Sequence, residues 1–467
     1  MTALHQLSAT ELSSAYAART LSPVEVTQAV IAQIERCEPR LHALYAYQPE
    51  AALAQARASA ARWAQGAPLS PLDGVPGTLK ENIATRGCPM PGGSAASDLT
   101  PLDWDAPPAA RWQEAGLVLL AKTTMPDFGM LSSGLSSFHA LARNPWNTAM
   151  NPGGSSAGAG SAGAAGYGPL HVGTDIGGSV RLPAGWCGLV GLKPSAGRVP
   201  IKPPYVGRVA GPMTRSVADC AALMAVLSRP DARDPTSLPP QDIAWGALQR
   251  DVKGLRLGLW LDAGWGLPVE PAVRAAVEAA ARAFEAAGAI VEPVAPFTGR
   301  AMMDGLDRFW RMRSWLDLQA LPAERRAKVL PYIQAWAGTG ATLSAAELFQ
   351  GYSQIAAFRD AAVAAIQPYD FLLSPTSPVP SFPADWAGPT NDPARPLEHI
   401  AFTVPFNMSE QPALSIHAGC TPEGLPIGLQ LIGHRFDDLG VLQLAAAWEQ
   451  LRGPMPDWPF VPRGPAA

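Results

Sequence analysis

Lysine is the least common charged residue in this chain of 467 residues. Only six of its 35 basic residues are lysine, and the remainder are arginine. Charged residues make up 16% of the sequence and the formal net charge is −4, so the chain lacks the basic field that attracts nucleic acid. We therefore expect no nucleic-acid partner, and a lysine in an apolar setting becomes a candidate for chemistry.

Signals for metal binding, disulfides and membrane insertion are also absent. The five cysteines show no C-x-x-C spacing, and the seven histidines form no H-x-x-x-H or H-E-x-x-H pair, which disfavours a zinc site or a disulfide framework. No apolar run reaches about 18 residues, and the first residues lack the features of a signal peptide. The sequence predicts a reduced, cytoplasmic protein without a metal, a cofactor or a membrane partner.

Two common glycine and serine motifs are incomplete. Gly158, Gly160 and Gly163 fit G-x-G-x-x-G, but turn residues rather than a hydrophobic strand precede them, so a dinucleotide site lacks its structural context. Neither Ser155 nor Ser179 lies in the G-x-S-x-G of a nucleophile elbow. A nucleotide-binding protein remains as an alternative, and a serine nucleophile would need a base other than histidine.

Strand-like apolar segments alternate with helical segments along the chain. Capping boxes at Ser8 and Ser22 begin two N-terminal helices. Further helical segments are predicted at 50–64, 156–165, 216–227, 271–287, 300–365 and 440–451. Strands or extended segments are predicted at 75–79, 117–121, 170–173, 188–192, 255–261, 289–294, 372–383 and 405–433. The alternation indicates an α/β sheet with helices on both faces.

The stretch from Gly153 to Arg198 contains two Gly-Gly-Ser turns, which end at Ser155 and Ser179. Because glycine lets the backbone approach closely, these turns suit either an anion cradle or a nucleophile beside free amides. Lys80 lies in the apolar segment GVPGTLKEN. Burial lowers a lysine pKa, and a neutral lysine can take a proton from a serine. Lys80 is thus either the missing base or an ordinary surface residue.

Several long segments, in the same order, resemble the amidase signature hydrolases. They are GVPGTLKEN, DAPPAARWQEAGLVLLAKTTMPDFG, NPGGSSAGAGSAGAAG, GTDIGGSVRLPAGWCGLVGLKPSAGRV and FNMSEQPALSIHAGCTPEGLPIGLQLIG. The resemblance implies a single large mixed β-sheet covered by helices on both faces. We expect one domain over 1–467, with N-terminal helices in 1–65, the catalytic core in 66–230, and a variable helical segment and further core strands in 231–467.

The resemblance also implies a Ser–cis-Ser–Lys triad. Ser179 would be the nucleophile, Ser155 the bridging serine whose preceding peptide bond is cis, and Lys80 the base. The implied oxyanion hole consists of the backbone amides of Ile176, Gly177, Gly178 and Ser179. The predicted reaction is hydrolysis of a carboxylic amide through an acyl-enzyme.

Residues around the turns are given supporting roles. Asp175 and Arg181 are expected to hold the second turn by hydrogen bonds, and Ser156 is either a helper or an ordinary helix-start residue. Ala157 stands where the family usually has glycine, and Glu81 where aspartate is common. Both departures leave the predicted triad intact.

Substrate identity is less constrained by the sequence. Gly129 and Met130 are expected to line the acyl pocket, and Trp310, Trp315 and Trp336 to form its entrance wall or part of the core. An apolar entrance favours a small hydrophobic or aryl amide, as in an aryl acylamidase, or a carbamate (urethane) or ester. The resemblance also implies a homodimer.

One rival function belongs to the same family. It is the glutamine-using A-type component of a tRNA amidotransferase, which depends on partner proteins. The triplet Thr174-Asp175-Ile176 differs from the Ser-Asp-Thr of that component, which disfavours this alternative.

Overall fold

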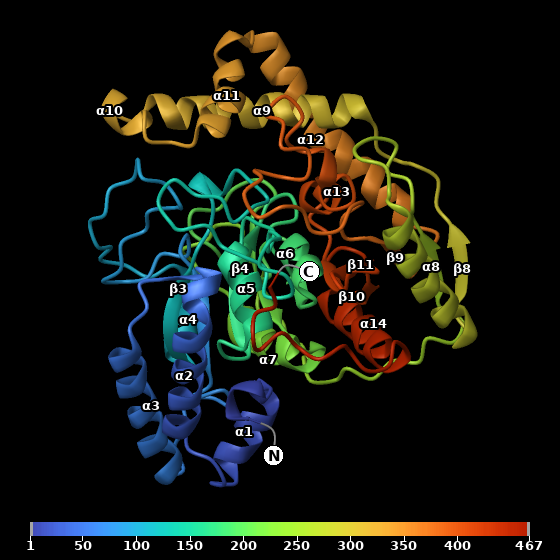
Figure 1. The fold of residues 1–467 in the computed structure, drawn as a ribbon. Coiled ribbons are helices and arrows are strands. Elements are labelled where there is room, and N and C mark those ends of the chain that lie inside the picture. Colours follow the sequence, from blue (N-terminus) through green and yellow to red (C-terminus); the bar gives the residue numbers. More distant parts are fainter. Residues whose placement is uncertain (1–2, 465–467) are drawn as a thin grey trace.

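A mixed β-sheet of eleven strands runs through the computed structural model, which describes residues 3–464 (Figure 1). The strand order is β1-β3-β2-β4-β6-β5-β10-β11-β9-β7-β8. The strands are β1 (Leu44–Tyr45), β2 (Pro76–Lys80), β3 (Val118–Thr123), β4 (Leu170–Asp175), β5 (Val190–Lys193), β6 (Val209–Thr214), β7 (Arg256–Leu259), β8 (Ile290–Pro293), β9 (Phe371–Pro375), β10 (Ala413–Cys420) and β11 (Pro426–Ile432).

Fourteen α-helices surround this sheet within residues 3–464. They are α1 (Ala9–Ala17), α2 (Pro23–Leu41), α3 (Pro49–Ala64), α4 (Pro107–Glu114), α5 (Ala157–Ala165), α6 (Arg181–Cys187), α7 (Val217–Leu227), α8 (Pro271–Ala286), α9 (Arg300–Gln319), α10 (Ala323–Arg326), α11 (Pro331–Gly338), α12 (Ala345–Ile366), α13 (Val404–Met408) and α14 (Asp438–Leu451). The capping boxes at Ser8 and Ser22 are present at the starts of α1 and α2.

Both faces of the sheet are covered, as the alternation along β10 shows. Leu414 and Ile416 belong to the main hydrophobic core together with residues of α7, α8 and α14. Ser415, between them, faces the other way, and its Oγ lies 3.1 Å from where a Cβ on Gly185 of α6 would be. Because successive strand residues point to opposite faces, α6 lies on the face opposite α7, α8 and α14.

The sheet brings distant chemical groups to one edge. Strands β2 and β4 are parallel neighbours, so their carboxyl ends, Lys80 and Asp175, lie at the same edge. Strand β6 is antiparallel to β4, and its first residue, Val209, pairs with Asp175. The residue before it, Arg208, therefore also reaches this edge. Figure 1 shows α9, α11 and α12 together at one end of the molecule and α1, α2 and α3 at the opposite end.

Besides strand β6, helix α6 is an element that the sequence pattern does not predict. It begins directly after the second Gly-Gly-Ser turn and contains Pro183 and Gly185, both poor helix formers. The predicted apolar segment 405–433 is also only partly extended, since Val404–Met408 forms α13 before β10 begins. In both places tertiary packing overrides the local pattern.

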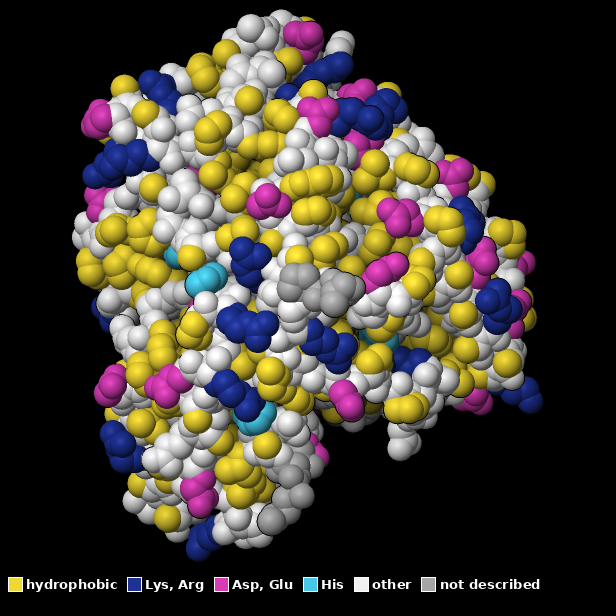
Figure 2. Space-filling model, viewed as in Figure 1, with side chains coloured by type: hydrophobic (Ala, Val, Ile, Leu, Met, Phe, Trp, Pro, Cys, Tyr) yellow, Lys and Arg dark blue, Asp and Glu magenta, His cyan; other side chains and the backbone are white. Residues whose placement is uncertain are grey.

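The surface carries both signs of charge. Figure 2 shows basic and acidic side chains among hydrophobic ones on the face in view. None of the helices within residues 3–464 combines the length and apolar character needed to cross a membrane.

Candidate active site

Lys80 is the last residue of β2 and is fully buried. Its Nζ donates to Ser155 Oγ at 2.7 Å and to Thr174 Oγ1 at 3.1 Å. Burial lowers the pKa of Lys80 well below its ordinary value, and the nearby Arg208 lowers it further, while Asp175 and Glu81 act in the opposite direction. A lysine in this setting can be neutral near physiological pH, as a proton acceptor must be.

Two other lysines in the described part of the chain, Lys122 and Lys193, are buried about as deeply as Lys80. Lys122 Nζ donates to Ile83 O and Thr85 Oγ1, and Lys193 Nζ donates to Pro194 O. Neither bonds a serine hydroxyl in the described residues, so Lys80 differs from both in its partner. The contact with Ser155 makes Lys80 the best candidate base.

Ser155 lies in the first Gly-Gly-Ser turn, directly before α5, and the Gly154–Ser155 peptide bond is cis. A Cβ on Gly154 would lie 2.4 Å from Ser133 N, so only glycine fits there. A Cβ on Gly129 would lie 3.3 Å from Ser155 Oγ. The backbone of Gly129 thus passes beside the serine that Lys80 contacts.

Ser179 lies in the second turn, between β4 and α6, and lines the cavity described below. The amide of Ser156 donates to Ser179 O at 3.3 Å, which joins the two turns. Within residues 3–464 no hydrogen bond joins the hydroxyls of Ser155 and Ser179. Catalytic hydrogen bonds are often long without substrate, so a relay between these two hydroxyls stays a prediction.

The backbone amides of the second turn are not equivalent. The N–H of Gly178, whose φ is +131°, donates to Asp175 Oδ1 at 2.8 Å. The amides of Ile176, Gly177 and Ser179 have no such partner in the described residues. Gly178 therefore shapes the turn in this structure, and the other three amides remain candidates for the oxyanion hole.

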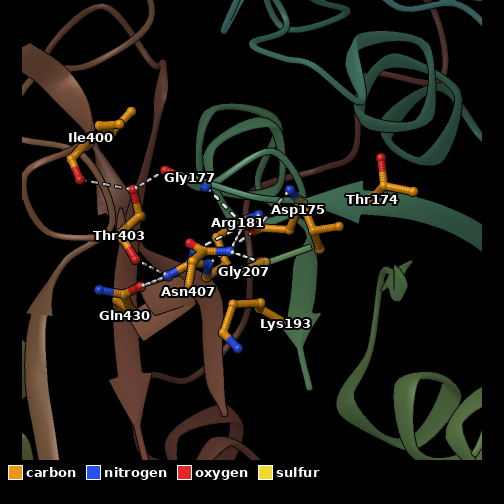
Figure 3. A network of polar contacts seen from close by, with 12 residues as sticks. Thr174, Asp175, Gly177, Arg181, Lys193, Gly207, Ile400, Thr403, Asn407 and Gln430 are labelled. Carbon is orange, nitrogen blue, oxygen red and sulfur yellow. Dashed lines mark hydrogen bonds and ion pairs between the residues drawn. The ribbon is translucent and has the colours of Figure 1, made fainter. Parts of the chain in front are cut away.

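Asp175 and Arg181 form a buried ion pair that organises this turn (Figure 3). Arg181 Nη2 and Nε lie 2.9 and 3.0 Å from the Asp175 carboxylate, and Arg181 Nη1 donates to Thr403 O and Gln430 Oε1. Burial alone would raise the pKa of Asp175, but the Arg181 guanidinium and several hydrogen bonds hold it below its usual value. The pair links the turn to α13 and β11.

Replacing Arg181 by methionine should lower the free energy of unfolding by about 3–5 kcal/mol, because it leaves the Asp175 carboxylate buried without its partner. Urea unfolding measures this change. The matched control is Arg256→Met, because Arg256 pairs with Glu292 where both side chains are well exposed, and that loss should stay below about 1 kcal/mol. Equal losses in the two variants would contradict the structural role of Arg181.

Ser156 and His171 have clear positions in the signature. Ser156 stands just before α5, but its hydroxyl bonds the backbone of Thr174 rather than capping the helix. His171 is buried, with its ring nitrogens near Thr78 Oγ1 and Gly168 O, and burial lowers its pKa to about 3. His171 is therefore a packed core histidine.

A cavity of about 500 Å³ opens beside Ser179. Gly129, Met130, Trp310 and Trp336 line it, as the sequence predicts, whereas Trp315 does not. Nine of the other lining side chains are apolar: Met90, Met125, Phe128, Leu131, Ile176, Pro203, Pro204, Leu397 and Ile400. The charged lining residues are Arg208, Arg313 and Asp317, which the sequence analysis does not single out.

The described residues contain no group of three or more His, Cys, Asp or Glu side chains arranged to hold a metal ion. The polar groups that line the cavity are hydroxyls, backbone amides, the Asn82 side chain, two guanidinium groups and the Asp317 carboxylate, and the buried amine of Lys80 contacts Ser155. Such a set is suited to acyl transfer by nucleophilic attack.

Comparisons with known proteins identify the family of this chain. The pattern that defines the Amidase family matches residues 25–442. The A-type component of the glutamyl-tRNA(Gln) amidotransferase of Myxococcus xanthus is 36% identical, over 96% of this chain and 97% of that protein. The corresponding protein of Chloroflexus aggregans is 34% identical, with 98% of each chain covered.

Among solved structures, a bacterial aryl acylamidase of the amidase signature family superposes with a TM-score of 0.88 at 30% identity, covering 96% of this chain and 97% of that chain. The peptide amidase of Stenotrophomonas maltophilia superposes with a TM-score of 0.81 at 28% identity, covering 95% and 96%. The family match and both kinds of relative span nearly the whole chain. This chain therefore belongs to the amidase family, the amidase signature enzymes.

Proposed function

We propose that this chain cleaves carboxylic amide C–N bonds by forming an acyl-enzyme on Ser179. The observation that carries the proposal is the 2.7 Å contact between the buried Lys80 amine and Ser155 Oγ. Neutral Lys80 accepts a proton from Ser155, which accepts one from Ser179 as Ser179 attacks the carbonyl carbon. The negative charge on the carbonyl oxygen is held by the amides of Ile176, Gly177 and Ser179.

The intermediate then collapses. The C–N bond breaks, and Ser155 returns a proton to the departing amine while Lys80 reprotonates Ser155. Water enters, loses its proton through the same relay and attacks the acyl-enzyme ester. The acid leaves and Ser179 regains its proton. Each step uses only groups that lie at this edge of the sheet.

The cavity supports a hydrophobic or aryl amide as the substrate. Its lining is dominated by methionine, leucine, isoleucine and tryptophan side chains, which bind apolar groups by removing them from water. A carbamate or ester would pass through the same acyl-enzyme. The aryl acylamidase that resembles this chain in structure supports the same substrate class.

The second candidate is the A-type component of an amidotransferase. The relatives by sequence favour it more strongly than the first, because they carry that name at up to 36% identity over nearly the full length. In that case the same amide cleavage would supply nitrogen to an acceptor held by partner proteins. The apolar cavity and the triplet Thr174-Asp175-Ile176 favour the hydrolase.

Activity of the chain purified alone separates the two candidates. We expect it to hydrolyse at least one member of a panel of aryl anilides, aryl carbamates and primary amides, and to hydrolyse glutamine more slowly. The Ser179→Ala variant is the control for a contaminating hydrolase. Cleavage of glutamine alone, and only with the other components of an amidotransferase added, would reject the hydrolase in favour of the second candidate.

A further inference from the structure

Arg208 is a cation in the active-site cavity without an acidic partner in the described residues. It lies directly before β6, at the edge that carries Lys80. Its Nη1 donates to Pro203 O at 3.0 Å and its Nη2 to Asn82 O at 3.4 Å. Both acceptors are backbone carbonyls, so the positive charge is not neutralised.

Arg313, the other arginine of the cavity, has a different environment. Asp317 lies 3.5 Å from it, and its guanidinium stacks 4.0 Å above the ring of Tyr205. These contacts satisfy its charge and fix its plane, and the side chain is well exposed at 42%. Asp317 is the single carboxylate among the lining residues, so Arg208 has no acid of its own in the cavity.

The unpaired positive charge of Arg208 near Lys80 is energetically unfavourable unless an anionic ligand neutralises it. Burial, and secondly the positive charge of Arg313, lower the pKa of Arg208 to about 10. A partly buried charge is costly to leave unpaired. Guanidinium groups have a planar set of donors that matches a carboxylate. Arg208 lines a cavity whose other side chains include nine apolar ones and a single carboxylate.

We propose that Arg208 binds a carboxylate of the substrate, so that this chain prefers amides with an apolar body and a carboxylate over neutral amides of the same shape. This inference rests on the proposed amide cleavage and narrows its substrate class. The carboxylate can belong to the acyl part or to the amine part of the amide. The test distinguishes these two positions because it uses one pair of substrates for each of them.

The test uses two matched pairs of substrates. N-benzoylglycine and N-ethylbenzamide differ by a carboxylate on the amine side, and adipic acid monoamide and hexanamide by one on the acyl side. The measured quantity is the ratio of kcat/KM for the anionic member to that for the neutral member. Because both members meet the same Lys80, effects of Arg208 on the base cancel in this ratio.

For at least one pair the native chain should favour the anionic member. Arg208→Gln should lower that ratio roughly 10- to 100-fold, as expected for loss of a hydrogen bond to a charged group. The ratio for Arg208→Lys should lie between those of the native chain and Arg208→Gln, because lysine keeps the positive charge but lacks the planar pair of donors of a guanidinium group. Arg313→Gln is the matched control, and it should change the ratio less than about threefold, because screened and already paired surface charges contribute little.

Two results would overturn the proposal while leaving the amide cleavage intact. One is hydrolysis of both pairs with ratios that Arg208→Gln does not change, and the other is a larger effect of Arg313→Gln. If none of the four compounds is hydrolysed, calorimetric titration of the same compounds into Ser179→Ala protein tests the inference by comparing the affinities of the anionic and neutral members. Tighter binding of an anionic member that depends on Arg208 supports the inference, and equal or absent binding rejects it.

Discussion

Replacement of Lys80 by methionine is expected to reduce kcat/KM for amide hydrolysis about 10²- to 10⁴-fold, the range contributed by a general base. Methionine keeps most of the buried volume but cannot accept the proton of Ser155, whose Oγ lies 2.7 Å from the Lys80 amine. Steady-state kinetics on the best substrate of the panel measure the effect. A drop of only twofold would mean that the base lies elsewhere.

Lys122→Met is the matched control. Lys122 is also a buried lysine, on the neighbouring strand β3, but it bonds Ile83 O and Thr85 Oγ1 away from both serines. We expect its kcat/KM to stay within about threefold of the native value, even though removal of a buried hydrogen-bonding group costs stability. A comparison of the two variants separates loss of the base from general damage to the sheet.

The pH dependence of the activity of the native chain also tests whether Lys80 is the base. The relay needs neutral Lys80, so activity should rise with pH as the ammonium loses its proton and fall as pH drops through the pKa. Burial, and then Arg208, lower that pKa against the opposing charges of Asp175 and Glu81. The rising limb should therefore lie well below the ordinary lysine value of 10.5.

Replacement of Ser179 by alanine should have the largest effect of any single substitution. Removal of the serine nucleophile of a serine protease lowers kcat by about 10⁶-fold. The control is Ser161→Ala, because Ser161 is buried in α5 of the same signature and its Oγ bonds Arg143 O outside the cavity. Full activity of Ser179→Ala with normal folding would reject the mechanism.

Much of the fold and of the site could be predicted from the sequence because the signals are local. Capping boxes, strand-length apolar runs and two Gly-Gly-Ser turns are each contained within a few residues. The alternation of strands and helices indicates the sheet, and Lys80 stands out because lysine is so rare. The resemblance to the amidase family then joined Lys80, Ser155 and Ser179, which are far apart in the chain.

The remainder depends on contacts between distant segments. Arg208 reaches the cavity only because β6 pairs with β4, and nothing near it in the sequence indicates that position. The amide of Gly178 is used by Asp175, which a glycine-rich turn cannot reveal by itself. Helix α6 forms although it contains proline and glycine, since Arg181 at its start bonds Thr403 and Gln430 from the C-terminal part of the chain.

The acyl-enzyme itself gives the most direct test of the account. Aryl carbamates transfer a carbamoyl group to an active-site serine, and the resulting ester hydrolyses slowly enough to detect by mass spectrometry. Trypsin releases residues 144–181 as one peptide that contains Ser155, Ser156, Ser161 and Ser179, so fragment ions must locate the added mass. We predict one carbamoyl group on Ser179, absent from the Ser179→Ala variant. The same group on Ser155 or Ser156, or unchanged labelling of Ser179→Ala, would contradict the assignment of the nucleophile.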